Sequence, residues 1–133
     1  MLSILRLAQS FHCKTALFFS SIVFAAAAQA ALPLRAGTYV DTQANECQDA
    51  PNASILTYDG HGFGGAHSSH CVSTTVKRTG NEYELSTTCS ALGDGTPVKP
   101  QKFKEKIRIL SPERFSMQFS EGIQTYKLCP DFK

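Results

Sequence analysis

Apolar and polar residues alternate in a series of short stretches along the chain, and turn-forming residues separate the stretches. Alternation with a period of two is typical of strands that have one face against a core. Turn signals recur about every ten residues, and no amphipathic helix pattern follows residue 30. The pattern therefore predicts an all-β fold, a small antiparallel β-barrel or sandwich of about seven strands. The expected strands cover residues 36–41, 54–58, 71–79, 82–89, 102–109, 115–119 and 124–128.

The clearest of these elements is a hairpin that turns at Gly80-Asn81. Glycine at the first central position suits a type II′ turn, whose twist matches that of the flanking strands. Pairing about this turn sets Val72 across from Cys89 and places both, together with Val76, on the core face. In this register Cys71 falls on the opposite face.

The first 30 residues have the features of a secretory signal peptide. Arg6 and Lys14 supply positive charge, an apolar run of 13 residues covers 16–28, and Ala28-Gln29-Ala30 is a small-x-small cleavage site. The run is shorter than the roughly 20 residues that span a bilayer, which argues against a retained anchor. We therefore expect cleavage after Ala30, a location in the periplasm or outside the cell, and a single disulfide-bonded β domain over residues 31–133.

Loss of the leader also changes the net charge. The whole chain has 13 Lys and Arg against 11 Asp and Glu, and two of the basic residues leave with the signal. The mature chain is then neutral and lacks a general electrostatic attraction to nucleic acid or anionic lipid. We expect neither nucleic acid nor, after cleavage, a membrane as a partner.

Four cysteines remain in the mature chain, and an even number in an oxidising compartment predicts two disulfides. They are Cys47, Cys71, Cys89 and Cys129. Because the hairpin register turns Cys71 outward and Cys89 inward, we expect the pairs Cys47–Cys71 and Cys89–Cys129. Two alternatives stay open. A simple up-and-down strand order brings Cys129 to the same end as Cys47, and a bulge in the hairpin permits a Cys71–Cys89 bond.

Residues 61–70 are rich in glycine and contain a single aromatic residue. An apolar ring on a flexible loop can insert into a cleft of another protein, and glycines let the backbone fit closely against it. We therefore assign partner binding to His61, Phe63, Gly64 and His67. The alternative is that the ring of Phe63 folds back onto the core.

The same segment contains all three histidines of the mature chain, which suggests a metal site. Imidazole groups bind zinc and copper, so His61, His67 and His70 are candidate ligands, with Asp59 as an oxygen ligand. Their spacing differs from the standard structural zinc motifs. A flexible polar loop with solvated histidines is the alternative, and we expect no resident cofactor.

A row of basic side chains stands on one face of the expected strand at 102–109. It consists of Lys102, Lys104, Lys106 and Arg108. The row has the charge to dock an acidic surface. Lysines on an outer strand face are also a common protection against edge-to-edge aggregation.

We assign no catalytic residues, because the serines and histidines near Asp59 lie within one loop and no rigid element fixes their geometry. In its size, leader and two-disulfide β outline, the chain resembles the small periplasmic inhibitors of lysozyme, a likeness that implies a binding role. We therefore predict a small, exported, monomeric and non-enzymatic binding protein. It would be of the inhibitor or immunity type and act on another protein through residues 61–70, and a periplasmic metal-binding protein is the alternative.

Overall fold

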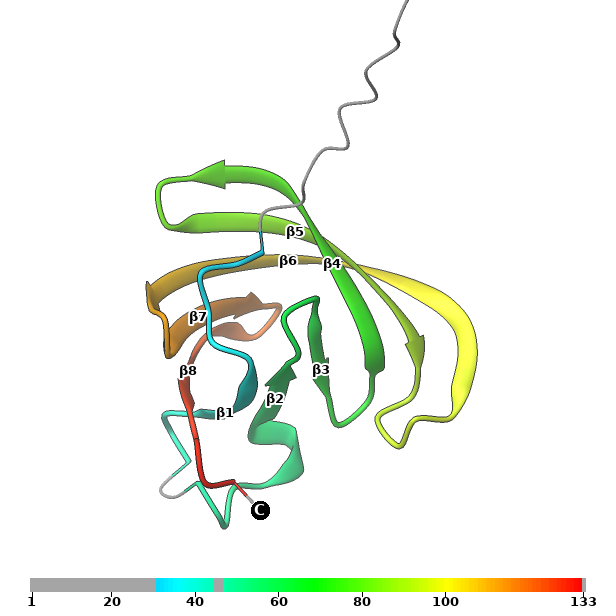
Figure 1. Ribbon diagram of the computed structural model, residues 1–133, viewed down its shortest axis with the longest axis horizontal. Coiled ribbons are helices and arrows are strands. Elements are labelled where there is room, and N and C mark those ends of the chain that lie inside the picture. Colours follow the sequence, from blue (N-terminus) through cyan, green and yellow to red (C-terminus); the bar gives the residue numbers. More distant parts are fainter. Residues whose placement is uncertain (1–30, 45–46, 133) are drawn as a thin grey trace, which may run out of the picture.

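The computed structural model describes residues 31–44 and 47–132 (Figure 1). The predicted signal peptide lies outside the described residues. Eight antiparallel strands form a nearly closed barrel, so the all-β prediction is confirmed, with a barrel in place of a sandwich. A 3-10 turn, η1 (Asn52–Ser54), precedes β2. In the described part of the chain, no helix has the length and apolarity needed to cross a membrane.

The strands differ greatly in length, and the long ones arch over the short ones in Figure 1. They are β1 (Gly37–Asp41), β2 (Ile55–Tyr58), β3 (Phe63–Gly65), β4 (Ser69–Thr79), β5 (Glu82–Ala91), β6 (Pro97–Ser111), β7 (Arg114–Phe119) and β8 (Gly122–Leu128).

The strand order is that of an up-and-down barrel. The sheet runs β3-β2-β1-β8-β7-β6-β5-β4, so neighbours in the sheet are neighbours in the chain except where β1 pairs with β8. The sheet ends, β3 and β4, are joined by a tight turn with a bridge between Gly65 and Ser68. Beyond it, the backbone N–H of Ser73 donates to the carbonyl of His61 at 2.8 Å. These contacts bring the two ends of the sheet together.

Aromatic rings fill the inside of the barrel. The ring of Phe115 lies at the centre, with ring centroids 5.1 Å from Tyr39, 5.0 Å from Phe63 and 5.2 Å from Tyr126. Each such pair adds about 0.5–1.5 kcal/mol to the gain from burial. As the alternation predicts, Ile107 and Ile109 of β6 and Phe115 and Met117 of β7 are buried, and the residues between them face outward.

Two elements differ from those expected. Strand β3 was not predicted, and β6 begins at Pro97, five residues before the strand expected at 102–109. Residues 97–105 of β6 pair with β5 alone, because the pairing with β7 reaches only as far as Lys106. A strand with one free edge tolerates Pro97 and Pro100, since a proline there removes no ladder hydrogen bond on that side.

The hairpin of β4 and β5 turns at Gly80-Asn81 as predicted, but its register changes beyond a bulge. Next to the turn the pairs are those expected, whereas beyond the irregularity between Thr75 and Lys77 every pair is shifted by one residue. Val72 and Val76 are consequently 54% and 68% exposed, not buried as predicted.

The predicted disulfide pairing is wrong, although the prediction of two disulfides is confirmed. The bonds are Cys47–Cys129 and Cys71–Cys89. The bulge places Cys71 on the same face as Cys89 and directly opposite it, with the Cα atoms 4.0 Å apart. Pairing of β1 with β8 brings Cys129 beside Thr38, whose carbonyl accepts the Cys129 N–H at 2.8 Å. The cysteine that follows β1 therefore bonds to the one that follows β8.

Candidate functional site

The segment of residues 61–70 is part of the barrel and not an irregular loop. It contains the turn from β2, the short strand β3 and the turn into β4. Asp59 fixes the first turn, since its Oδ1 accepts hydrogen bonds from the backbone N–H groups of His61 at 2.8 Å and Gly62 at 2.9 Å. Partial burial opposes ionisation of this carboxyl, but the N–H donors outweigh it and lower the pKa of Asp59.

Phe63 lies in the core, where it is 3% exposed. Its ring centroid is 4.9 Å from that of Tyr58 and 5.0 Å from that of Phe115. The expectation that this ring inserts into a partner is therefore corrected in favour of the alternative, in which it folds back onto the core. The physical reason is that β3 closes the barrel, and Phe63 is the only side chain on this strand that can fill the inward position.

The glycines around Phe63 serve close packing of backbone against backbone. A Cβ atom at Gly62 would collide with the carbonyl of Cys71, and one at Gly93 would collide with the carbonyl of Ala66. A Cβ at Gly64 would lie 3.2 Å from the carbonyl oxygen of Ser68. These positions need glycine because β3, β4 and the turn before β6 approach one another closely.

The three histidines are exposed but lie apart in the fold. His61 is in the turn before β3, His67 is in the turn after it, and His70 is in β4. Within residues 31–44 and 47–132, no three His, Cys, Asp or Glu side chains are placed to hold a metal ion together. The structure therefore does not assemble the histidine site that the sequence suggested.

A chain of polar side chains on the inner face of the long strands was missed by the sequence analysis. The buried Thr87 hydroxyl donates to the carboxylate of Glu105 and lies 2.7 Å from the Ser73 hydroxyl. Since Thr87 has one proton, Ser73 donates in the second bond. Burial raises the pKa of Glu105, and the bond from Thr87 only partly opposes this. The available signal was an acidic residue at an inward position, between Phe103 and Ile107.

The outer face of β4 to β8 carries a groove of about 530 Å³. The outward side chains that line it form rows across the strands. One row consists of Lys77, Glu84, Lys106, Gln118 and Ile123. The next consists of Thr79, Glu82, Arg108, Ser116 and Thr125.

This groove combines charge with exposed aliphatic surface. Arg108 forms an ion pair with Glu82, and its Nε donates to the same carboxylate oxygen at 3.0 Å. Both side chains are more than half exposed, so the pair contributes only about 0–1 kcal/mol to folding. Leu110 and Ile123 also line the groove and are 49% and 68% exposed. The groove therefore offers both polar and apolar contacts to a second molecule.

The basic row of β6 is divided by its neighbours. Lys106 and Arg108 lie opposite glutamates of β5, whereas Lys102 and Lys104 lie opposite Thr88 and Ser86. Lys102 and Lys104 belong to the part of β6 that β7 does not reach. Their position on a free edge favours protection against edge-to-edge association over a dedicated docking role.

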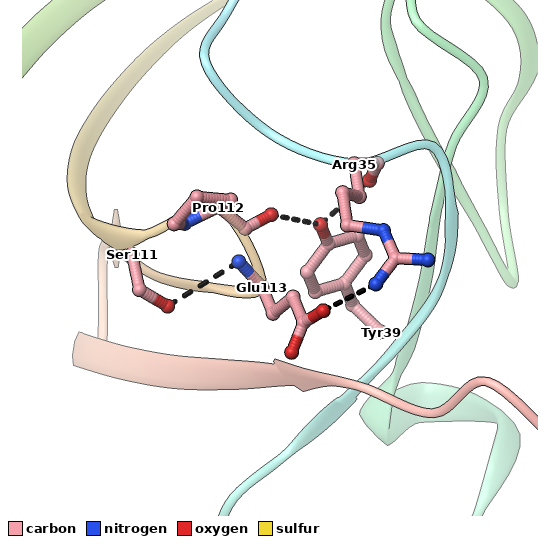
Figure 2. Close-up of polar contacts among 5 residues, drawn as sticks. All are labelled: Arg35, Tyr39, Ser111, Pro112 and Glu113. Atoms are coloured by element: carbon pink, nitrogen blue, oxygen red, sulfur yellow. Dashed lines mark hydrogen bonds and ion pairs between the residues drawn. The ribbon is translucent and has the colours of Figure 1, made fainter.

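The turn from β6 to β7 is held firmly against the segment before β1, as Figure 2 shows. The Tyr39 hydroxyl, which is fully buried, donates to the carbonyl of Arg35 at 2.6 Å and lies 3.3 Å from that of Pro112. The guanidinium of Arg35 forms an ion pair with Glu113, whose N–H donates to the Ser111 hydroxyl at 3.3 Å. These contacts fix the turn against Arg35 and Tyr39.

Comparison with known proteins identifies no relatives. No protein-family model matches the chain, and no curated protein or solved structure matches it either.

Proposed function

We propose that the chain is an exported, non-enzymatic binding protein that recognises another extracytoplasmic protein through the groove on the outer face of β4 to β8. The observation that carries this proposal is the pair of exposed aliphatic side chains, Leu110 and Ile123, within a groove lined by charged and hydroxyl groups. Apolar surface surrounded by polar residues is typical of protein interfaces.

The packing inside the barrel favours an external contact. Small eight-stranded barrels are either filled by their own side chains or hold a small ligand inside. Here the rings of Tyr39, Phe63, Phe115 and Tyr126 occupy the interior. A binding role is therefore better supported on the surface.

Two disulfides support the exported location. Cys47–Cys129 joins the segments that follow β1 and β8, Cys71–Cys89 joins β4 to β5, and such bonds form and persist in oxidising compartments. A stapled scaffold also loses little conformational entropy on binding, which favours affinity.

The contact surface in this proposal differs from the one expected at residues 61–70. Burial of Phe63 removes the apolar anchor of that segment, and its exposed residues are His61, Ala66, His67 and His70, none of which has a large apolar side chain. A contact through residues 61–70 is tested by the His67 variant in the experiment below.

Site-specific photo-crosslinking tests the proposal. A photoreactive phenylalanine analogue replaces Ile123 in the full chain, which is expressed with its own leader in the source organism. Val76 is the matched control position, because it is also 68% exposed but does not line the groove. A third variant carries the analogue at His67.

We expect one adduct of defined mass from position 123 and none from position 76. An adduct from position 67 alone would support the loop in place of the groove. No adduct at all, or equal adducts from 76 and 123, would contradict the proposal.

A further inference from the structure

Two cations lie directly opposite each other on the outer face of β7 and β8. They are Arg114 and Lys127, which are register partners in this strand pair. Like charges at directly opposite positions repel and destabilise a strand pair. In the part of the chain that the structure describes, the two ion pairs join Arg35 to Glu113 and Arg108 to Glu82, and neither involves these cations. The fold therefore keeps an unfavourable pair that an anion would neutralise.

The two cations share a surface hollow with hydroxyl groups. A hollow of about 410 Å³ is lined by Arg114, Lys127, Thr42 and Ser111. The guanidinium group offers a planar fork of N–H donors that matches an oxyanion, and the ammonium group adds a second positive charge. Ser and Thr hydroxyls supply neutral donors. The lining thus has the donors and the charge that a phosphate group requires.

One carboxylate, that of Glu113, also borders this hollow. Figure 2 shows that it is turned toward the guanidinium of Arg35, with which it is ion-paired. Arg35 also donates its backbone N–H to the carbonyl of Pro112 at 2.8 Å, and the N–H of Leu128 donates to the carbonyl of Glu113 at 2.9 Å. Arg35 thereby compensates the negative charge of Glu113. The two hydrogen bonds hold the backbone beside Arg114 and Lys127 in place.

We propose that Arg114 and Lys127 bind a phosphate group, with the hydroxyls of Thr42 and Ser111 as additional donors. Two cations match the charge of a phosphate dianion, which favours phosphate over a singly charged carboxylate. The phosphate is either free or part of a monoester on a larger molecule. Ser116 and Thr125 of the groove lie two residues away on the same strand faces, so the phosphate site adjoins the proposed protein-binding surface. Phosphate binding at Arg114 and Lys127 does not require the groove to bind a protein.

The test is a titration of the exported chain, oxidised and labelled with ¹⁵N, followed by two-dimensional NMR. Inorganic phosphate, glycerol 1-phosphate and acetate are added separately at constant ionic strength. We expect saturable shifts of the amide signals of Arg114 and Lys127 with phosphate, the monoester or both, and none with acetate. Saturation by the monoester alone identifies the ligand as a phosphate group on a larger molecule. Saturation by inorganic phosphate as well shows that the site also binds the free anion.

Variants separate a specific site from general attraction to positive charge. Arg114→Gln and Lys127→Gln should each weaken binding about tenfold, because each removes a charge-assisted hydrogen bond. Lys104→Gln, an exposed lysine opposite Ser86, should leave binding unchanged. Glu113→Gln should tighten it severalfold, since it removes a negative charge from the rim. Shifts that do not saturate, equal saturation by acetate, or an equal loss in Lys104→Gln would overturn the proposal.

Discussion

Replacement of Phe63 by alanine should destabilise the barrel severely. The ring is 3% exposed and packs against the rings of Tyr58 and Phe115, on the strand that closes the sheet. Replacing a buried phenylalanine by alanine costs about 3–5 kcal/mol, because burial is lost and a cavity remains. A domain of this size has a total stability of about 5–15 kcal/mol. The change should lower the melting temperature by about 15–25 °C, at about 5 °C per kcal/mol.

Thermal and urea unfolding of the oxidised protein, followed by circular dichroism, measure this loss. The matched control is Phe103→Ala, since Phe103 is also an inward-facing phenylalanine but is 41% exposed. Its loss should cost about 1 kcal/mol or less, because much of the ring remains in contact with water. Equal, small effects of the two substitutions would refute the placement of Phe63 in the core, and would restore the hypothesis that its ring faces a partner.

Two further predictions concern pH and the disulfides. Burial raises the pKa of Glu105, so the folded protein binds a proton that the unfolded chain has released, and stability falls as the pH rises through the folded pKa. Glu105→Gln should therefore be more stable than the unmodified protein at about pH 7 and equal to it at about pH 3; urea unfolding at both values checks this, and a less stable variant at neutral pH would contradict it. Cys47 and Cys129 are 82 residues apart and Cys71 and Cys89 are 18 apart, so loop entropy predicts losses of about 4.5 and about 3.2 kcal/mol when each pair is replaced by alanine. Urea unfolding of the two double variants measures both losses. Equal losses, or a larger loss for the Cys71–Cys89 pair, would show that the entropy of the unfolded chain does not dominate the stabilisation by these disulfides.

The strand pattern was predictable wherever one face meets the core and no residue is inserted. Phe115 and Met117 alternate with polar residues, and the structure buries both. Ile107 and Ile109 do the same on β6. In such stretches, burial of apolar surface and the period of the strand impose the same arrangement. The sequence alone was therefore sufficient for the fold class.

The register of β4 was not predictable from alternation, because a bulge adds one residue without a change in composition. Val72 and Val76 have the spacing of core residues, yet Val76 lies at the bulge, the alternation is reversed beyond it, and both are exposed. Cys71 takes the inward position that the pattern assigned to its neighbour. Once Cys71 and Cys89 face each other and bond, Cys47 and Cys129 remain to form the second disulfide. The opposition of Cys71 and Cys89 is evident only from the register of the folded strands.

The candidate sites were predictable only in part, because the same residue type serves opposite purposes. Glycine at position 62 indicates mobility when the sequence is considered alone, but in the structure it permits close contact with the carbonyl of Cys71. Glu105 carried a usable signal, since an acidic residue interrupts an apolar face. The sequence gives no signal for Arg114 and Lys127, because they lie opposite each other only through the pairing of β7 with β8.

The pairing of β1 with β8 has a consequence for the order of events during synthesis. Of the described strands, the one made first pairs with the one made last, and the cysteines that follow these two strands form one disulfide. Until β8 has been delivered, β1 has one unpaired edge and the wall stays open beside the aromatic interior. Closure at this seam therefore has to wait for β8, and a chain interrupted before residue 122 would expose the unpaired edge of β1 to proteases.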